Sequence, residues 1–104
     1  MPKYVLTYHG GAGLPETEAA QAELMAAWGD WFAELGDALV DGGAPFGETV
    51  AVGPEGESTL DPADPLTGYS ILVAEDVQTA MRHASTCPVL AGGGTVKVSA
   101  AIEM

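Results

Sequence analysis

The sequence predicts one α+β domain of the ferredoxin-like βαββαβ type: a four-stranded antiparallel sheet with two helices on one face. Three observations lead to this prediction. Segments of strand character stand near both ends and around the middle of the chain, and two segments with helical spacing lie between them. The 104 residues suffice for one hydrophobic core but not for two, so residues 1–104 are expected to form a single domain.

The first third of the chain predicts a strand and then a long helix. Aromatic and β-branched residues dominate Tyr4–His9, a strand expected to end at the glycine-rich turn Gly10–Gly13. That turn has neither the spacing of a dinucleotide fingerprint nor the lysine of a phosphate loop. A helix is expected over Glu16–Leu39, with Pro15 suited to its first position. Its apolar stripe comprises Leu24, Trp28, Trp31, Leu35 and Leu39.

The middle of the chain predicts a helix stop, a second strand and a hairpin. Glycines followed by a proline in Asp41–Pro45 are typical of a helix end. Phe46–Val52 then predicts the second strand, Gly53–Gly56 a turn, and Ser58–Leu60 a short returning hairpin arm. The two prolines of Asp61–Pro65 indicate an extended surface link.

The last third predicts a strand, a helix and a final strand. Tyr69–Ala74 is a nearly continuous apolar run, which is typical of a strand in the middle of a sheet. Asp76 suits the N-cap of a helix that Cys87-Pro88 closes. In Thr95–Ile102 every second residue is apolar, so one side of this strand is expected to meet the helices.

Two helices on one face leave the other face of the sheet uncovered. Strands one and three carry apolar residues such as Val5, Ile71 and Val73 toward that face. Pairing with a second copy, face to face, would bury them in an eight-stranded dimeric α/β barrel. We therefore expect a homodimer in which polar residues on that face line an enclosed cavity.

The charge of the chain excludes several classes of partner. Fifteen Asp and Glu residues oppose three Lys and Arg residues, a formal net charge of −12, so nucleic acids and anionic membranes would be repelled. An acidic, solvated surface accounts for this charge, with a cationic partner as the alternative. The single cysteine precludes an internal disulfide, and no apolar run approaches the roughly 18 residues of a membrane span. The N-terminal residues lack signal-peptide features, so the cytoplasm is the expected location.

Four segments carry a family resemblance: Lys3–His9, Ala27–Phe32 with Leu35-Gly36, Gly68–Ala74, and Cys87–Val96. Together they resemble the YCII-related domain family, also called DGPF-domain proteins. The resemblance spans nearly the whole chain and is strongest from Gly68 onward.

This resemblance implies a ferredoxin-like domain that forms a dimeric α/β barrel, with a small-molecule pocket and usually no assigned function. Some relatives are proposed to use a His and an Asp in that pocket, and at least one branch resembles enzymes that remove halide from an aromatic compound. When the chain is aligned with such relatives on Leu35 and Pro45, the first-helix position at which they have that His is occupied by Trp28. The name-giving Asp-Gly-Pro-Phe is echoed, with extra residues, in Asp41–Glu48.

His9 is the first candidate for chemistry. It ends the first strand beside the glycine-rich turn and shares strand parity with Val5 and Thr7. If that side faces the cavity, His9 could act as a general base, with an acid such as Asp41 orienting it. The alternative is a strand-end histidine bonded to the turn.

The other reactive side chains suggest structural roles. His83 falls opposite the apolar stripe of the second helix, so we expect it to be exposed. Cys87 follows a helix C-terminus, an end that disfavours a thiolate, so we expect a small buried residue. Two His and one Cys show no recognised ligand spacing, and neither a metal nor another cofactor is expected.

Five residues are candidates for ligand binding. Trp28 either fills the core or walls an aromatic-binding pocket, with Phe46 and Tyr69 as its neighbours. Lys97 and Ser99 lie on the side of the last strand away from the helices and could offer a cation and a hydroxyl to an anionic ligand.

Three functions therefore stay open. The first is a homodimeric domain that binds a small molecule without a cofactor. The second is a cofactor-free enzyme, lyase-like or oxygenase-like, that acts on a small aromatic or acidic compound with His9 as base. The third is a structural or partner-binding dimer, and fold alone does not choose among them.

Overall fold

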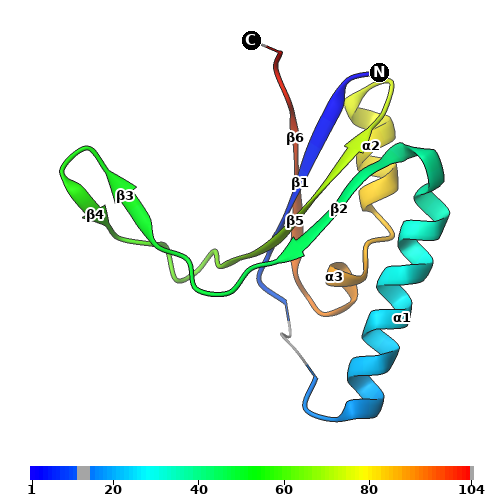
Figure 1. Cartoon of the computed structure of the whole chain (residues 1–104), viewed down its shortest axis with the longest axis horizontal. Helices are drawn as coiled ribbons and strands as arrows, with labels where there is room; N and C mark the ends of the chain where they lie inside the picture. The colour runs from blue at the N-terminus through cyan, green and yellow to red at the C-terminus, as the bar shows by residue number, and fades with distance from the viewer. Residues whose placement is uncertain (12–14, 104) are drawn as a thin grey trace.

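A four-stranded antiparallel sheet forms the centre of the computed structural model, which describes residues 1–11 and 15–103 (Figure 1). Its strand order is β2-β5-β1-β6, and every neighbouring pair is antiparallel. The strands are β1 (Lys3–His9), β2 (Leu39–Pro45), β5 (Leu66–Val73) and β6 (Thr95–Ala100). Ala12 and Gly13 of the expected glycine-rich turn lie outside the described residues.

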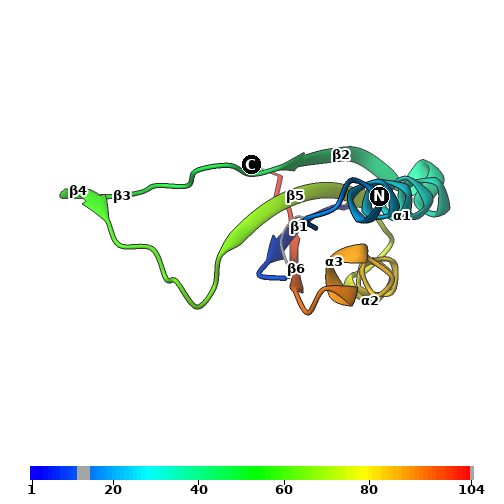
Figure 2. The same cartoon turned by 90° about the horizontal axis from the view of Figure 1, so that it is seen from below.

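Three helices cover one face of this sheet, as Figure 2 shows from below. They are α1 (Glu18–Leu35), α2 (Val77–Ala84) and the single turn α3 (Pro88–Ala91). The Thr17 side chain caps α1 by accepting a hydrogen bond from the Ala20 amide, so Pro15 precedes this helix instead of opening it. Asp76 caps α2 through the Thr79 amide, as predicted. In the described residues, no helix is both long and apolar enough to cross a bilayer.

The core lies between this sheet face and the helices. Alternation along β1 turns Leu6 and Tyr8 toward α1, where they meet Trp31 and Leu35. Leu72 of β5 lies in the same cluster, and Val96 and Val98 of β6 pack against it. The predicted parity of these three strands is therefore confirmed, because their helix-facing residues are the apolar ones.

The second strand does not lie where the sequence predicted it. The helix ends earlier than expected, at Leu35, because Gly36 adopts a positive φ of 55° that stops it. A short 3-10 turn, η1 (Gly36–Ala38), follows, and β2 then comprises Leu39, Val40 and the predicted helix stop Asp41–Pro45. Pairing with β5 overrides the poor strand propensity of Gly42 and Gly43, which lie where the β2–β5 register shifts.

The segment between β2 and β5 forms a projecting hairpin. Its strands are β3 (Ala51–Gly53) and β4 (Gly56–Ser58), which pair antiparallel around the predicted turn. We call residues 47–60 the arm, because Figures 1 and 2 both show this segment reaching away from the sheet and the helices. Of the expected second strand Phe46–Val52, only Ala51 and Val52 lie in a strand, and they belong to the arm.

Candidate functional site

The sheet face opposite the helices, here called the open face, gathers the polar candidates. Odd-numbered residues of β1, β5 and β6 point toward it, since their neighbours in sequence point into the core. Thr7 pairs with Tyr69 of β5 on one side and Lys97 of β6 on the other, which makes one row across the sheet. Other residues on this face are Lys3, Val5, His9, Ile71, Val73 and Ser99.

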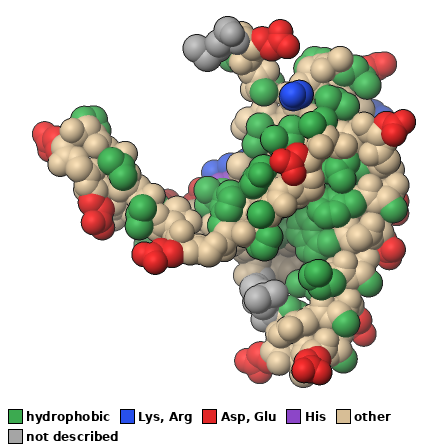
Figure 3. Space-filling view, in the orientation of Figure 1, with side chains coloured by type: hydrophobic (Ala, Val, Ile, Leu, Met, Phe, Trp, Pro, Cys, Tyr) green, Lys and Arg blue, Asp and Glu red, His purple; other side chains and the backbone are tan. Residues whose placement is uncertain are grey.

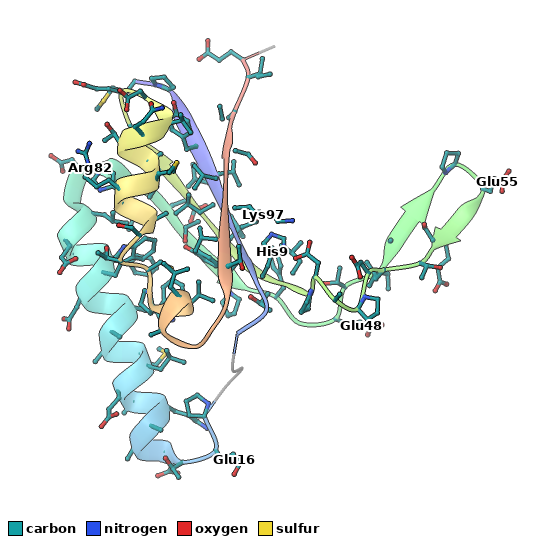
Figure 4. All side chains as sticks on the ribbon, turned by 180° about the vertical axis from the view of Figure 1, so that it is seen from behind. His9, Glu16, Glu48, Glu55, Arg82 and Lys97 are labelled. Atoms are coloured by element: carbon teal, nitrogen blue, oxygen red, sulfur yellow. The ribbon has the colours of Figure 1, made fainter. Side chains whose placement is uncertain are left out.

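Asp64 joins His9 and Lys97 at one end of the open face. Its Oδ1 lies 2.9 Å from Nδ1 of His9, and its Oδ2 accepts a hydrogen bond of 2.9 Å from Nζ of Lys97. Figure 4 shows His9 and Lys97 side by side, where the link returning from the arm reaches the sheet. The hydrogen bond from Lys97, assisted by the proximity of His9, lowers the pKa of Asp64 below its ordinary value.

The His9 ring is held at both nitrogens. Nε2 lies 2.8 Å from the hydroxyl of Thr7, its neighbour two residues back on the same strand face. Nδ1 is buried against Asp64 and makes no aligned hydrogen bond, so this contact is chiefly electrostatic. The His9 side chain is 12% exposed, whereas that of Lys97 is 56% exposed. A carboxylate at one nitrogen and a hydroxyl at the other is an arrangement that orients a histidine for proton transfer.

Asp41 does not orient His9. It lies on β2 opposite Ile71, whereas His9 pairs with Leu66 at the other end of β5, roughly 16 Å away at about 3.3 Å per residue. Its carboxylate instead accepts a hydrogen bond of 2.8 Å from the Gly43 amide and lies 3.4 Å from the Tyr69 hydroxyl. Asp64, in a link predicted only as surface connection, occupies the place expected for Asp41.

Two of the predicted aromatic residues meet at the open face. The rings of Phe46 and Tyr69 stack, with centroids 5.7 Å apart and an interplanar angle of 21°. Tyr69 is half-buried in the row that contains Lys97, and Phe46 is exposed beyond the end of β2. Ser99 is exposed one row away, opposite Val5. These four candidates therefore share one face of the sheet or its edge.

Trp28 lies on the other side of the sheet. Its ring makes edge contacts with Tyr8 at 5.1 Å and with Trp31 at 5.6 Å, both within the helix-facing core. Because the sheet separates this cluster from Lys97 and Ser99, Trp28 cannot wall a pocket with them in one chain. Core packing, the first of the two interpretations, describes its position.

The remaining reactive groups have structural surroundings. Cys87 is 3% exposed, and burial raises the pKa of its thiol to about 11, so it stays a thiol at neutral pH. His83 is half-buried and therefore less exposed than predicted, and its backbone carbonyl accepts a hydrogen bond from Trp31 Nε1 at 3.0 Å. Among the described side chains, no three His, Cys, Asp or Glu residues converge as a metal site would require.

The site at His9 is shallow in a single chain. Two hollows lie elsewhere: one between the chain ends, lined by Lys3 and Ile102 among others, and one in the turn of the arm around Pro54. No protein-family model matches the chain, and no curated protein is similar to it. The fold and the residues themselves therefore carry the functional argument, and they define a small α+β domain with a polar cluster on an uncovered sheet face.

Proposed function

We propose that this chain is a homodimeric domain of the YCII-related type that binds a small acidic or aromatic molecule on its open face. In this proposal the strand order β2-β5-β1-β6 is that of a ferredoxin-like βαββαβ domain, and two sheets pair face to face in a dimeric α/β barrel. The protein acts in the cytoplasm, and the ligand, not a resident cofactor, fills the space between the sheets.

The distribution of cations is the observation that carries the proposal. The chain has only three Lys and Arg residues, and both lysines lie on the open face, Lys97 beside the half-buried His9. The third cation, Arg82, lies on α2, and most of so acidic a surface would repel an anion, whereas the open face offers ammonium groups, the hydroxyl of Ser99 and the stacked pair Phe46–Tyr69. A small carboxylate attached to an aromatic ring matches those groups.

The uncovered face also supports the pairing. Val5, Ile71 and Val73 lie between the polar residues and remain partly exposed in the single chain. A second sheet packed on them would remove apolar surface from water, at roughly 25 cal/mol per Å². It would also turn the shallow site at His9 into an enclosed one, in which charged groups act more strongly.

Ligand binding can be tested with benzoate, salicylate and phenylacetate as probes in isothermal titration calorimetry. We expect binding that weakens about tenfold or more in Lys97→Ala, since a charge-assisted hydrogen bond contributes roughly 1.5–3 kcal/mol. Arg82→Ala is the matched control, because Arg82 lies on α2, away from the open face (Figure 4). Equal affinities for the two variants would contradict this site, and no binding of any probe would contradict the ligand class.

An enzyme that uses His9 as a general base is the second candidate, favoured by the Asp64 carboxylate at Nδ1 and the Thr7 hydroxyl at Nε2. A His9→Ala variant that keeps full activity on an identified substrate would remove this candidate. A purely structural dimer is the third, and it predicts an interior filled by side chains that takes up none of the probes. The first and third candidates require a dimer, so a solution mass of one chain at micromolar concentration would contradict both of them.

A further inference from the structure

The arm exposes more apolar surface than a free hairpin would be expected to carry. Val50 is 65% exposed and Val52 is 80% exposed, although both belong to a segment that alternates as a strand does. Strands β3 and β4 have three residues each. A two-stranded hairpin of this size is marginally stable by itself in water, and it gains stability when it packs against another surface.

The negative charge of the arm limits the surfaces to which it can bind. Residues 47–60 include Glu48, Glu55 and Glu57 but no Lys, Arg or His. Figure 3 shows these acidic groups along the arm, which stands clear of the body. In a molecule of net charge −12, most surfaces would repel such a segment.

The open face is the complementary surface. It carries Lys3 and Lys97 among the partly exposed apolar residues Val5, Ile71 and Val73. On the arm, Val52 pairs directly with Glu57 across the hairpin, so a valine and a carboxylate share one face of it. Val52 beside Glu57 on the arm is thus complementary to the open face, where apolar side chains lie beside the lysines Lys3 and Lys97.

The arm projects outward on the side of the sheet that carries the open face, opposite the helices, and it does not fold back onto that face in its own chain (Figures 2 and 4). The link that follows it is pinned by Asp64, which holds Lys97 and His9, and by the hydrogen bond of 2.9 Å from the Gly10 amide to the Pro65 carbonyl. From this fixed base the hairpin extends outward, as both views of the ribbon show. The open face that it can reach is that of another copy.

We propose that, in the homodimer, the arm of each copy reaches past the paired sheets to the end of the other copy's open face that carries His9 and Lys97, and closes the site there. This inference rests on the proposed dimer and adds that the ligand site is completed by the second chain. Two-fold symmetry makes the exchange reciprocal, so every contact occurs twice. The glutamates of the arm would then compete with an anionic ligand for Lys97, and the valines would supply the apolar wall of the site.

Sedimentation equilibrium tests the contribution of the arm to the dimer. We expect the double variant Val50→Ser/Val52→Ser to dissociate at a concentration at least about tenfold higher than the wild type, because four valines per dimer lose their apolar contacts. Val77→Ser is the matched control, since Val77 is 40% exposed on α2, and its dimer should be unchanged. A dimeric wild type with an unaffected double variant would overturn the arm proposal and leave the dimer standing.

Cross-linking tests where the arm lies. Val52→Cys, labelled with a benzophenone maleimide, is mixed as isotopically heavy and light copies; buried Cys87 should not react. Irradiation should join the probe to β1 or β6 of the other isotope, and Asp30→Cys on α1 should give no such product. Products within one chain only, or products on α2, would overturn the proposal. A monomeric wild type would overturn it together with the proposed function.

Discussion

Ser70 is a buried polar residue of the core, and its hydroxyl is satisfied on both sides. It accepts a hydrogen bond of 2.6 Å from the Tyr8 hydroxyl and donates one of 2.8 Å to the Gly42 carbonyl. Burial raises the pKa of Tyr8 far above its ordinary value, so this phenol stays protonated and can donate. The chain of bonds links β1, β5 and β2 through their core-facing side.

Removing the middle of this chain should cost more than removing its end. Ser70→Ala removes the hydrogen bond that each of the Tyr8 hydroxyl and the Gly42 carbonyl makes to Ser70, and it is expected to destabilise by about 1–3 kcal/mol. Tyr8→Phe keeps the bond from Ser70 to Gly42 and is expected to cost about 0.5–1.5 kcal/mol. Urea unfolding followed by tryptophan fluorescence measures both. A larger loss in Tyr8→Phe would contradict this account.

Asp64 links the stability of the fold to pH. Its pKa is lowered from 3.8 by the Lys97 hydrogen bond first and by the charge of His9 as well. Because the pKa is lower in the folded chain than in the unfolded one, the stabilising contribution of Asp64 is complete above about pH 5. The contribution is lost as the pH falls through the lowered value, where the carboxylate takes up a proton.

Asp64→Asn should therefore flatten the acid side of the stability profile. The variant is expected to lose less stability between about pH 5 and pH 2 than the wild type, because the amide does not titrate. Asp64→Asn should still lose some stability as the pH falls, since Asp76 also has a lowered pKa through its hydrogen bonds with Thr79. Asp30→Asn on α1 is the control, and thermal melts across this pH range give the comparison. Parallel profiles for Asp64→Asn and wild type would refute the linkage.

Gly43 shows why β2 forms from residues that look unsuited to a strand. It adopts a φ of 75°, and a Cβ at this position would collide with the backbone of Tyr69 on β5. Only glycine permits both the left-handed backbone and the close approach of the two strands. The glycines that suggested a helix stop are thus required by an irregular strand at the sheet edge.

Gly43→Ala should consequently be strongly destabilising. The left-handed backbone alone costs roughly 1–3 kcal/mol for a residue with a Cβ, and the collision with β5 adds to it. Gly47→Ala is the matched control, since no atom lies within 4 Å of the Cβ position there, and it should change stability by less than about 0.5 kcal/mol. Urea unfolding measures the stability of both variants. Similar unfolding midpoints for Gly43→Ala and Gly47→Ala would contradict the predicted backbone strain at Gly43.

The whole molecule carries its net charge of −12 on a single small domain. The ion pairs of Asp64 with His9 and Lys97 lie at one site. Most carboxylates therefore face water and one another, and their mutual repulsion opposes the compact state. Repulsion between exposed charges reaches about 30 Å in 0.01 M salt but only about 10 Å in 0.1 M salt, because added ions screen it.

The melting temperature should accordingly rise with ionic strength. Between about 0.01 M and 0.5 M sodium chloride, screening relieves the repulsion among carboxylates more than it weakens the exposed pairs of Asp64. Differential scanning calorimetry at neutral pH measures the change, with an equal osmolality of glycerol as the control for non-ionic effects. A melting temperature that falls with added sodium chloride would show that the ion pairs outweigh the repulsion.

Local patterns predicted most elements of the fold. The alternation in Thr95–Ala100 and the N-cap at Asp76 operate within a few residues, so they can be recognised without knowing the rest of the chain. The Gly36 cap was missed, because the apolar spacing of the helix continues past it to Leu39. The predicted position of the second strand was wrong because the strand forms by pairing with β5. No pattern within the segment itself indicates that pairing. Strand propensity yields to such pairing at the edge of a sheet.

The residues of the candidate site were likewise predictable from the sequence only in part. His9 and Lys97 were assigned to one sheet face from strand parity alone, and both lie there. Their common partner Asp64 could not be recognised, since a carboxylate in a proline-rich link resembles any other surface acid. Trp28 was left open between core and pocket, and the packing of α1 on Tyr8 decided it.

The sequence by itself determined the apolar and polar faces of the strands, the N-cap of α2 at Asp76 and the strongly acidic surface, because periodicity and composition are local properties. Only the tertiary structure decided that the link after the arm brings Asp64 to His9 and Lys97, and that the arm projects from the sheet. Contacts between distant segments depend on the path of the loops, and that path is set by the balance of packing over the whole chain.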